Sequence, residues 1–314
     1  MSVNSSNHNY RRFLQIPYNH VDKLIVGGVL SGTTLASVKL IDGDGNLLTN
    51  ITYPGTNVRS VYSNSKGEYY SLAPLGSNKV VIYDENGAVK ANITGSLSGG
   101  ENTLYWFNDN LYLGQGSSVK KLTMTGSEVW SYSMPNTVRG IVVDSDYVYA
   151  CSSNGSLVKL SSTGSLVWQQ EWGNTLSGID VDSSGNVYTV GSVTSSITTR
   201  KWSSTGSVLW SVNDATSGLN PFASGVIVDD TYVYTCSSTG DTRRRNVSDG
   251  SVSWVASTNH GDILRDITID NEGNVYVCGN NILASDIAIR KFNSSGTQLW
   301  TQTHETTMWS IHWG

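Results

Sequence analysis

The sequence is poor in charged residues, cysteine and long apolar runs, and each shortage excludes a class of protein. Charged residues make up 14% of the 314 positions, and the formal net charge is −5. A nucleic-acid partner is therefore not expected, because neutralising phosphates requires a basic surface. Three cysteines cannot build a disulfide framework. No run of 18 apolar residues occurs, so no transmembrane helix is predicted.

Signals for catalysis and export are also missing. The five histidines fall at unrelated positions, and no Ser/His/Asp spacing, metal-ligand cluster or phosphate-binding loop stands out. The first 20 residues lack a basic start followed by an apolar stretch, which predicts no secretory signal. The sequence therefore favours a protein that is not an enzyme and that needs no cofactor or metal.

What the sequence does contain is a repeat, seen most clearly in residues 178–210. Ile179 and Val181 alternate with aspartates, which is the period of a half-buried strand. A Ser/Gly/Asn turn then leads to a second strand at 187–190, and two more strands follow before Trp210. Four short antiparallel strands joined by turns make one small sheet.

Three markers of this unit recur together about every 42 residues. The glycine of the last turn recurs as Gly45, Gly87, Gly126, Gly164, Gly206, Gly250 and Gly296. A tryptophan follows four residues later in the last five units, as Trp130, Trp168, Trp210, Trp254 and Trp300. The second strand carries a tyrosine, at Tyr70, Tyr112, Tyr149, Tyr188, Tyr234 and Tyr276. Such a period, with four strands a unit, is typical of β-propeller blades.

The two ends of the repeat region complete each other. The first unit begins in its middle, near Asp22, and residues 308–313 have the pattern of a lone first strand. We predict an all-β, seven-bladed propeller of four-stranded antiparallel blades over residues 21–314. Pairing of a C-terminal strand, at about 306–313, with the N-terminal blade closes the ring and removes its open edge. Residues 1–20 lack the repeat and are predicted to form an N-terminal arm, either a disordered tail or a tether that docks on a partner.

A candidate binding site lies at one mouth of the predicted channel, which the first strand of each blade should line. The residue before the core of that strand varies between units, whereas a purely structural position tends to stay alike. This column contains Arg59, Tyr105, Arg139, Ser177, Ser224, Arg265 and Trp309. Guanidinium groups with aromatic rings suit an anionic or sugar-like ligand. The arginines alternatively pair with nearby carboxylates, such as Asp266, or with loop carbonyls.

Other acidic and basic positions favour structural interpretations. An aspartate column is expected to cap turns through backbone amides, and it contains Asp144, Asp182, Asp229 and Asp270. The segment from Asp42 to Asn46 imitates the start of a calcium loop, but Leu47 stands where that loop needs glycine. Residues 243–245 are three arginines, expected as a solvated basic patch, with a docking site as the alternative. The cysteines are expected as separate buried side chains at Cys151, Cys236 and Cys278.

The repeat, with its GNVY second strand and its STG-x-x-W ending, resembles the quinoprotein-like (PQQ-like) and seven-bladed β-propeller repeat families over about residues 21–314. The resemblance implies that the five recurring tryptophans dock each blade against the next. Adjacent cysteines and an export signal, which accompany the cofactor in quinoprotein enzymes, are missing, and this argues against a quinone-dependent dehydrogenase. Short propellers rich in Ser, Thr, Asn and Gly also look like virion proteins of tailed bacteriophages.

We therefore expect a non-enzymatic structural or binding module of a phage virion, such as a decoration, tail or host-recognition component. Its expected partners are other virion proteins, through the arm, and a host-surface glycan, with no nucleic acid and no membrane insertion. Its expected location is the virion. Two alternatives remain: a bacterial propeller enzyme or ligand-binding protein that uses the arginine-rich mouth, and an intracellular interaction scaffold. A fold does not by itself decide among these functions.

Overall fold

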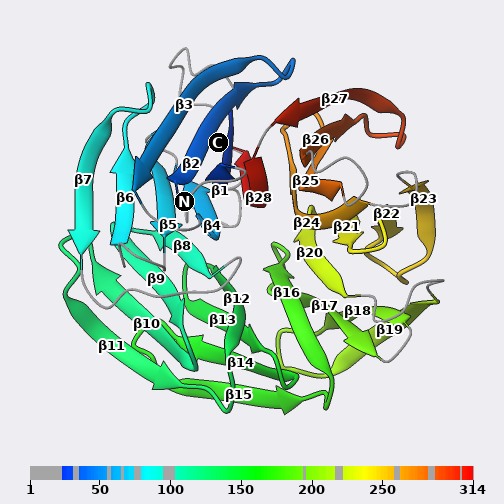
Figure 1. The fold of residues 1–314 in the computed structure, drawn as a ribbon. Helices are drawn as coiled ribbons and strands as arrows, with labels where there is room; N and C mark the ends of the chain where they lie inside the picture. The colour runs from blue at the N-terminus through cyan, green and yellow to red at the C-terminus, as the bar shows by residue number, and fades with distance from the viewer. Residues whose placement is uncertain are drawn as a thin grey trace, which may run out of the picture.

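The computed structural model describes residues 23–30, 35–54, 58–64, 67–73, 79–94, 103–193, 196–215, 222–257, 262–281, 287–304 and 306–313. The predicted arm, residues 1–20, lies outside the described residues. Seven four-stranded sheets surround a central channel, and every pairing between neighbouring strands is antiparallel (Figure 1). The prediction of a seven-bladed propeller is confirmed. The described residues contain no helix that is long and apolar enough to span a membrane.

The blades are numbered in chain order, each from the channel outward. Blade 1 contains β28 (Thr306–Trp313), β1 (Lys23–Leu30), β2 (Leu35–Asp42) and β3 (Leu47–Pro54). Blade 2 contains β4 (Ser60–Ser63), β5 (Tyr69–Ala73), β6 (Lys79–Tyr83) and β7 (Val89–Thr94). Blade 3 contains β8 (Leu104–Phe107), β9 (Asn110–Gln115), β10 (Ser118–Thr123) and β11 (Glu128–Ser133). Blade 4 contains β12 (Val138–Val143), β13 (Tyr147–Ser152), β14 (Ser156–Ser161) and β15 (Leu166–Glu171).

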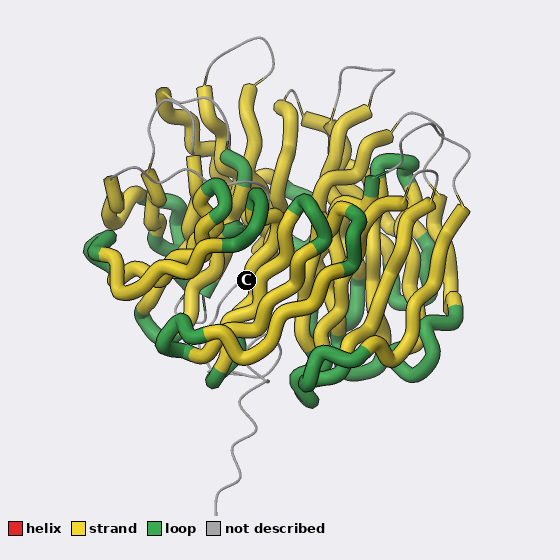
Figure 2. Tube along the Cα trace, turned by 90° about the horizontal axis from the view of Figure 1, so that it is seen from below, coloured by secondary structure: helices red, strands yellow, loops and turns green. Residues whose placement is uncertain are grey.

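The last three blades follow the same plan. Blade 5 contains β16 (Thr175–Val181), β17 (Val187–Val193), β18 (Ser196–Trp202) and β19 (Val208–Ala215). Blade 6 contains β20 (Ala223–Val228), β21 (Tyr232–Ser237), β22 (Asp241–Asn246) and β23 (Val252–Ser257). Blade 7 contains β24 (Asp262–Ile269), β25 (Val275–Asn281), β26 (Ile287–Phe292) and β27 (Gln298–His304). Figure 2 shows from the side that the strands run between the two faces of the ring.

The ring closes where the sequence predicts it. Strand β28 forms the inner strand of blade 1 and pairs with β1 from Leu24 opposite Trp313 to Leu30 opposite Thr306. Figure 1 shows β28, in red, beside β1, in blue. Because the inner strand comes from the C-terminus and the other three from the N-terminus, blade 1 ties both ends of the described chain into one sheet.

The core lies between the blades. Second-strand tyrosines are among the largest fully buried side chains, and they are Tyr70, Tyr149, Tyr188, Tyr234 and Tyr276. Tyr188 also donates a hydrogen bond to the Asp182 carboxylate at 2.9 Å. Each tyrosine thus satisfies its hydroxyl while its ring fills the interface, as a buried phenol requires.

Candidate functional site

The predicted mouth column lies at irregular points of the innermost strands. Arg139, Ser177, Ser224 and Arg265 each fall at a register shift between the first and second strands of their blade. A β-bulge leaves one residue unpaired and changes the direction of its side chain. These four positions of the column are therefore bulged residues, placed at the beginning of strands that line the channel.

The three arginines of this column have different surroundings. Arg139 is exposed, whereas Arg59 and Arg265 are half-buried. The Arg265 guanidinium lies 5.3 Å from the ring centroid of Phe222, which precedes the inner strand of the neighbouring blade 6. Trp309 falls at the register shift of β28, and its side chain lies outside the described residues. Binding at these residues stays a prediction.

The structure places Tyr105 deeper in the channel than its alignment with the arginines suggests. Tyr105 pairs with the second-strand Tyr112, whereas in blade 4 the residue opposite Tyr149 is Val142. Tyr105 is therefore equivalent to Val142, three positions beyond Arg139. The alignment failed because the short sequence before β8 carries no marker of its register, which only the cross-strand partner fixes.

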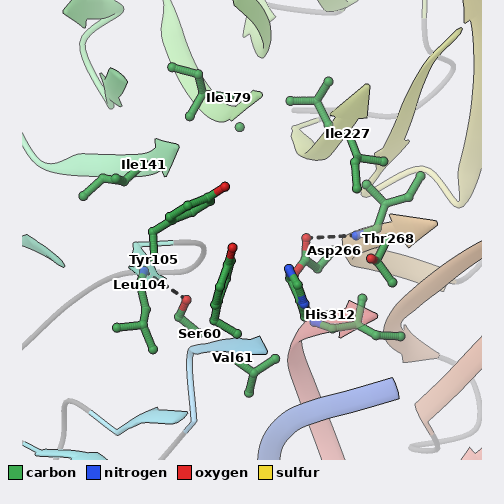
Figure 3. Close-up of a pocket in the computed structure, with 15 residues that line it drawn as sticks. Ser60, Val61, Leu104, Tyr105, Ile141, Ile179, Ile227, Asp266, Thr268 and His312 are labelled. Atoms are coloured by element: carbon green, nitrogen blue, oxygen red, sulfur yellow. Dashed lines mark hydrogen bonds between the residues drawn. The ribbon is translucent and has the colours of Figure 1, made fainter. Parts of the chain in front are cut away.

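Tyr105 belongs to an aromatic cluster that the sequence did not reveal. Its ring centroid lies 4.6 Å from that of Tyr62, which in turn lies 4.4 Å from the His312 ring. The Nδ1 atom of His312 is 2.7 Å from the Ser63 Oγ. Figure 3 shows Tyr105 and His312 extending into the channel from different blades. A correct strand register would have revealed the cluster, because Tyr62, Tyr105 and His312 occupy equivalent positions.

Below the mouth, aliphatic side chains narrow the channel. One such residue comes from each blade, and each is between 2% and 9% exposed: Val61, Leu104, Ile141, Ile179, Val226, Ile267 and Ile311. They line a cavity of about 70 Å³ together with Tyr62, Tyr105 and His312 (Figure 3). Ligand pockets usually have roughly 300–1,000 Å³. This cavity has room for only a few water molecules.

Hydrogen bonds between inner strands connect the blades on both sides of the closure. The Ser310 Oγ donates to the Asp266 Oδ2 at 3.0 Å and accepts the amide N–H of Val61 at 3.2 Å. The Ser60 Oγ accepts the Leu104 amide in the same way, at 3.2 Å. Asp266, which was considered as a partner of the arginines, is thus bonded to β28. These bonds join blades 7, 1, 2 and 3.

The five recurring tryptophans contact the next blade. Each indole Nε1 donates to a backbone carbonyl in a turn of that blade, at 3.0–3.2 Å. The donors Trp130, Trp168, Trp210, Trp254 and Trp300 reach the carbonyls of Ser162, Ser204, Val247, Ser294 and Gly43 respectively. These contacts match the docking of each blade against the next that the family resemblance implies. The same geometry accounts for the marker glycine, since a Cβ on Gly164 would lie 2.7 Å from the Trp130 indole.

A cationic side chain supports the tryptophan, and sequence reasoning missed it. Lys159, Lys201, Arg244 and Lys291 donate to the same carbonyls as the tryptophans of their own blades. The sequence signal was a basic residue at one position of the third strand. Because a lysine or arginine usually marks a solvated surface, that signal did not indicate an inter-blade contact.

The interpretation of residues 243–245 as a solvated patch is wrong. Arg245 is 2% exposed and pairs with the Asp214 carboxylate of blade 5. The Arg244 guanidinium lies 3.9 Å from the Tyr232 ring centroid and donates to the Ser294 carbonyl of blade 7. The arginines therefore connect three successive blades, because their stems and forks reach partners on both sides.

The aspartate column caps turns, as predicted. The Asp182 Oδ1 accepts the amides of Ser184 and Asn186 at 3.0 and 2.9 Å. Asp42 accepts the amides of Asp44 and Asn46 in the same arrangement. The calcium-like segment is therefore the same turn. The described residues contain no group of three or more His, Cys, Asp or Glu side chains arranged for a metal.

Within the described residues, the three cysteines are buried thiols outside any disulfide, each in a different blade. Burial raises the pKa of the Cys151 thiol to about 12 and that of Cys236 above its ordinary value. A thiol that resists ionisation is a poor nucleophile and metal ligand, so these side chains act as small core residues.

Comparisons with known proteins agree with this architecture. The family model described as "Outer membrane protein assembly factor BamB", of the PQQ-like repeat type, matches residues 115–313. The WD40 β-propeller domain of Doa1 is a similar solved structure, with 15% identity, a TM-score of 0.68, and coverage of 81% of this chain and 84% of that one. The computationally designed Ika8 protein has 14% identity, a TM-score of 0.63, and coverage of 91% and 90%. These two likenesses show the fold alone. No curated protein matches the sequence.

Proposed function

Because the chain belongs to the PQQ-like β-propeller family described as outer membrane protein assembly factor BamB, we propose that it is a rigid, non-enzymatic structural or binding module. Two features of the ring support a role that depends on its outer surfaces. Its channel is narrowed to a cavity of about 70 Å³. Paired donors to shared carbonyls join blade 4 to 5, 5 to 6, 6 to 7 and 7 to 1.

Exposed apolar side chains carry this proposal. They lie on the outermost strand of every blade and are between 44% and 54% exposed: Leu47, Leu48, Val89, Val129, Leu166, Val167, Val208, Leu209, Val252, Val255 and Leu299. Among the described residues, each outermost strand pairs with one neighbour only, so its other edge is unpaired there. Apolar side chains beside unpaired strand edges are the features through which protein partners bind or add a strand.

The assembly that we propose is the virion of a tailed bacteriophage, with residues 1–20 as the attachment arm and a host-surface glycan as a further partner. The low charge and the Ser-, Thr-, Asn- and Gly-rich composition support a module held on a particle. This finer role rests on the sequence resemblance. The family match supports the coarser role, that of a PQQ-like propeller module.

Co-sedimentation tests the role on a particle. Three purified proteins are compared: the full chain, a chain lacking residues 1–20, and an Arg59→Ala/Arg139→Ala/Arg265→Ala variant. Each is mixed with host-type bacterial cells and with phage particles that lack this protein. We expect the full chain and the arginine variant to sediment with particles and the armless chain to stay in solution. If the full chain binds no particle, the virion role is refuted.

A second variant tests the exposed apolar side chains. Leu209, on β19, is 53% exposed, so a Leu209→Lys substitution should leave folding intact. We expect it to weaken binding to particles at least several-fold if the outermost strands hold protein partners. Unchanged binding by this variant and by the equivalent Leu48→Lys variant would show that the exposed apolar side chains do not hold protein partners, and would refute the proposal that rests on them.

A second candidate function is the binding of a small anionic or sugar-like ligand at the mouth. The bulges support it, because they re-aim Arg139 and Arg265 at the beginning of the channel. Calorimetric titration with inorganic phosphate and with sugar phosphates tests it. This function predicts heat of binding for the full chain and none for the arginine variant.

A further inference from the structure

A groove of about 630 Å³ lies between blades 4 and 5, away from the channel. One wall is made by Tyr147, Val167 and Trp168 of blade 4, and the other by turns of blade 5 that contain Ser183 and Ser204. The volume is in the range of small-molecule pockets. Blade docking does not require this empty space, because Trp168 and Lys159 beside it already donate hydrogen bonds to blade 5.

The sequence creates this groove through a short turn. The hairpin between β12 and β13 has Tyr147 two residues before the second-strand tyrosine, where blade 5 has Asn186. Asn186 turns inward and donates to the Asp182 carboxylate at 2.9 Å. Tyr147 cannot make that contact, and its ring instead lies under the Lys159 ammonium, 3.7 Å from the Nζ. Blade 4 therefore has an aromatic side chain at the groove, where blade 5 has an amide that is hydrogen-bonded inside its own turn.

The equivalent position between blades 6 and 7 is arranged differently. Tyr232 replaces Tyr147 there, and Arg244 replaces Lys159. The longer Arg244 side chain stacks on Tyr232 and donates to the Ser253 Oγ at 2.8 Å. Ser253 stands where blade 4 has Val167, which offers no acceptor. Two substitutions thus distinguish the position between blades 6 and 7, where Arg244 contacts Tyr232 and Ser253, from the groove of ligand size between blades 4 and 5.

The groove between blades 4 and 5 contains both hydrogen-bond donors and hydrogen-bond acceptors. The Lys159 ammonium has three donors, one of which the Ser204 carbonyl takes at 3.2 Å. Burial lowers the pKa of Lys159. The exposed Asp146 carboxylate accepts from the Ser145 Oγ at 3.1 Å and has further acceptor capacity. Hydroxyl groups of Ser183 and other serines complete the opposite wall.

We propose that this groove binds a carbohydrate, one or two sugar units in size. A sugar has hydroxyls that donate to a carboxylate and accept from an ammonium, and apolar C–H faces that pack on aromatic and aliphatic side chains. The groove offers Asp146, Lys159 and the wall of Tyr147 and Val167 for these contacts. An ammonium beside a carboxylate favours a neutral polyhydroxylated ligand over an anion. This inference rests on the proposed function as a binding module and names a ligand class and its site.

Saturation-transfer NMR on the full-length chain tests the proposal. The probes are glucose, galactose, rhamnose, N-acetylglucosamine and their disaccharides at millimolar concentration, and the dipeptide Ala-Ala is the non-sugar probe. A Lys159→Arg/Val167→Ser variant copies the arginine and serine of the equivalent position between blades 6 and 7. We expect the sugar signal of this variant to be at least five-fold weaker than that of the unaltered chain. The matched Arg244→Lys variant should keep the full signal.

Each outcome has one interpretation. Thermal melts establish that both variants are folded, and an Asp146→Asn variant gives a second, conservative change in the groove, which should also weaken the signal. The carbohydrate assignment is overturned if no sugar gives a signal, or if all variants give equal sugar signals. It is also overturned if the groove variants lose the Ala-Ala signal and keep the sugar signals. Co-sedimentation with particles is measured separately, so failure of this inference is distinguishable from failure of the proposed function.

Discussion

Two constraints, one of backbone conformation and one of packing, require glycine at position 164. Its φ is +84°, in the left-handed region, and a Cβ on it would lie 2.7 Å from the Trp130 indole. Gly173 has a similar φ of +79° but no heavy atom within 4 Å of such a Cβ. The pair separates the backbone requirement for glycine from the packing requirement of the blade interface.

We expect Gly164→Ala to lower the free energy of unfolding by roughly 2–4 kcal/mol, since left-handed strain adds to overpacking. Gly173→Ala should lower it by about 1 kcal/mol, because the strain acts alone. Urea unfolding followed by tryptophan fluorescence measures both values. Equal losses in the two variants would mean that the indole moves aside and that this contact does not hold the blades together.

At the same scale, the sequence revealed the repeated tryptophans and missed an ion pair that occurs once. The tryptophan column was recognised because five units share it in one phase. The role of Arg245 was missed because its partner, Asp214, lies in the preceding blade and occupies no repeated position. A cation with one distant carboxylate leaves no periodic pattern, and only the folded chain brings the two together.

At the scale of strands, the turns and the alternation of apolar residues located the blades, whereas the register of the innermost strands was beyond the sequence. A bulge inserts one residue and shifts every later position to the other face. The mouth column survived this shift in blades 4–7, where the bulges recur. It failed in blade 3, where Tyr105 lies in the channel beside Tyr62. The aromatic cluster was therefore missed together with it.

Strand β28 is the element on which closure depends. Residues 306–313 supply the inner strand of blade 1, and Ser310 links β28 to blades 2 and 7. We expect a chain ending at residue 304 to have a melting temperature at least 10 °C lower, because it exposes the edge of β1 and the apolar side chains behind it.

A synthetic peptide of residues 305–314 should restore the melting temperature of that truncated chain when added in excess, by binding in place of β28. A peptide with Ser310→Ala and Ile311→Asp serves as the control and should restore little. Scanning calorimetry reads both effects. A truncated chain that melts like the full chain would show that closure through blade 1 contributes no stability.

For the whole molecule, the buried phenols and thiols are expected to make the folded state less stable as the pH rises into the alkaline range. Burial is the largest cause of a raised pKa at Tyr70, Tyr112, Tyr149 and Tyr188, and it also raises the pKa of Cys151 and Cys236. The value reaches about 12 for both Tyr112 and Cys151. In an unfolded chain these groups ionise near pH 8.5 for Cys and 10 for Tyr.

The sign follows from proton binding. Above pH 8.5–10 the unfolded chain has released protons that the folded chain still holds, so the stability is complete below those values and falls as the pH rises toward the folded pKa. Each group then removes about 1.4 kcal/mol per pH unit. All six groups act in the same direction, so their losses accumulate against a total stability that is about 5–15 kcal/mol in an ordinary protein.

We therefore expect cooperative unfolding near pH 11. The absorbance of ionised tyrosine should rise in two stages: exposed tyrosines titrate near pH 10, and the buried ones ionise together with the loss of the circular-dichroism signal. These tyrosines lie in four successive blades. An inner-strand bond joins blades 2 and 3, and indole-to-carbonyl bonds join blade 3 to 4 and blade 4 to 5, so one ionisation in an interface loosens the next. If all tyrosines ionise near pH 10 while the circular-dichroism signal persists, the blade interfaces are open to water and the ring is not the rigid unit that its contacts indicate.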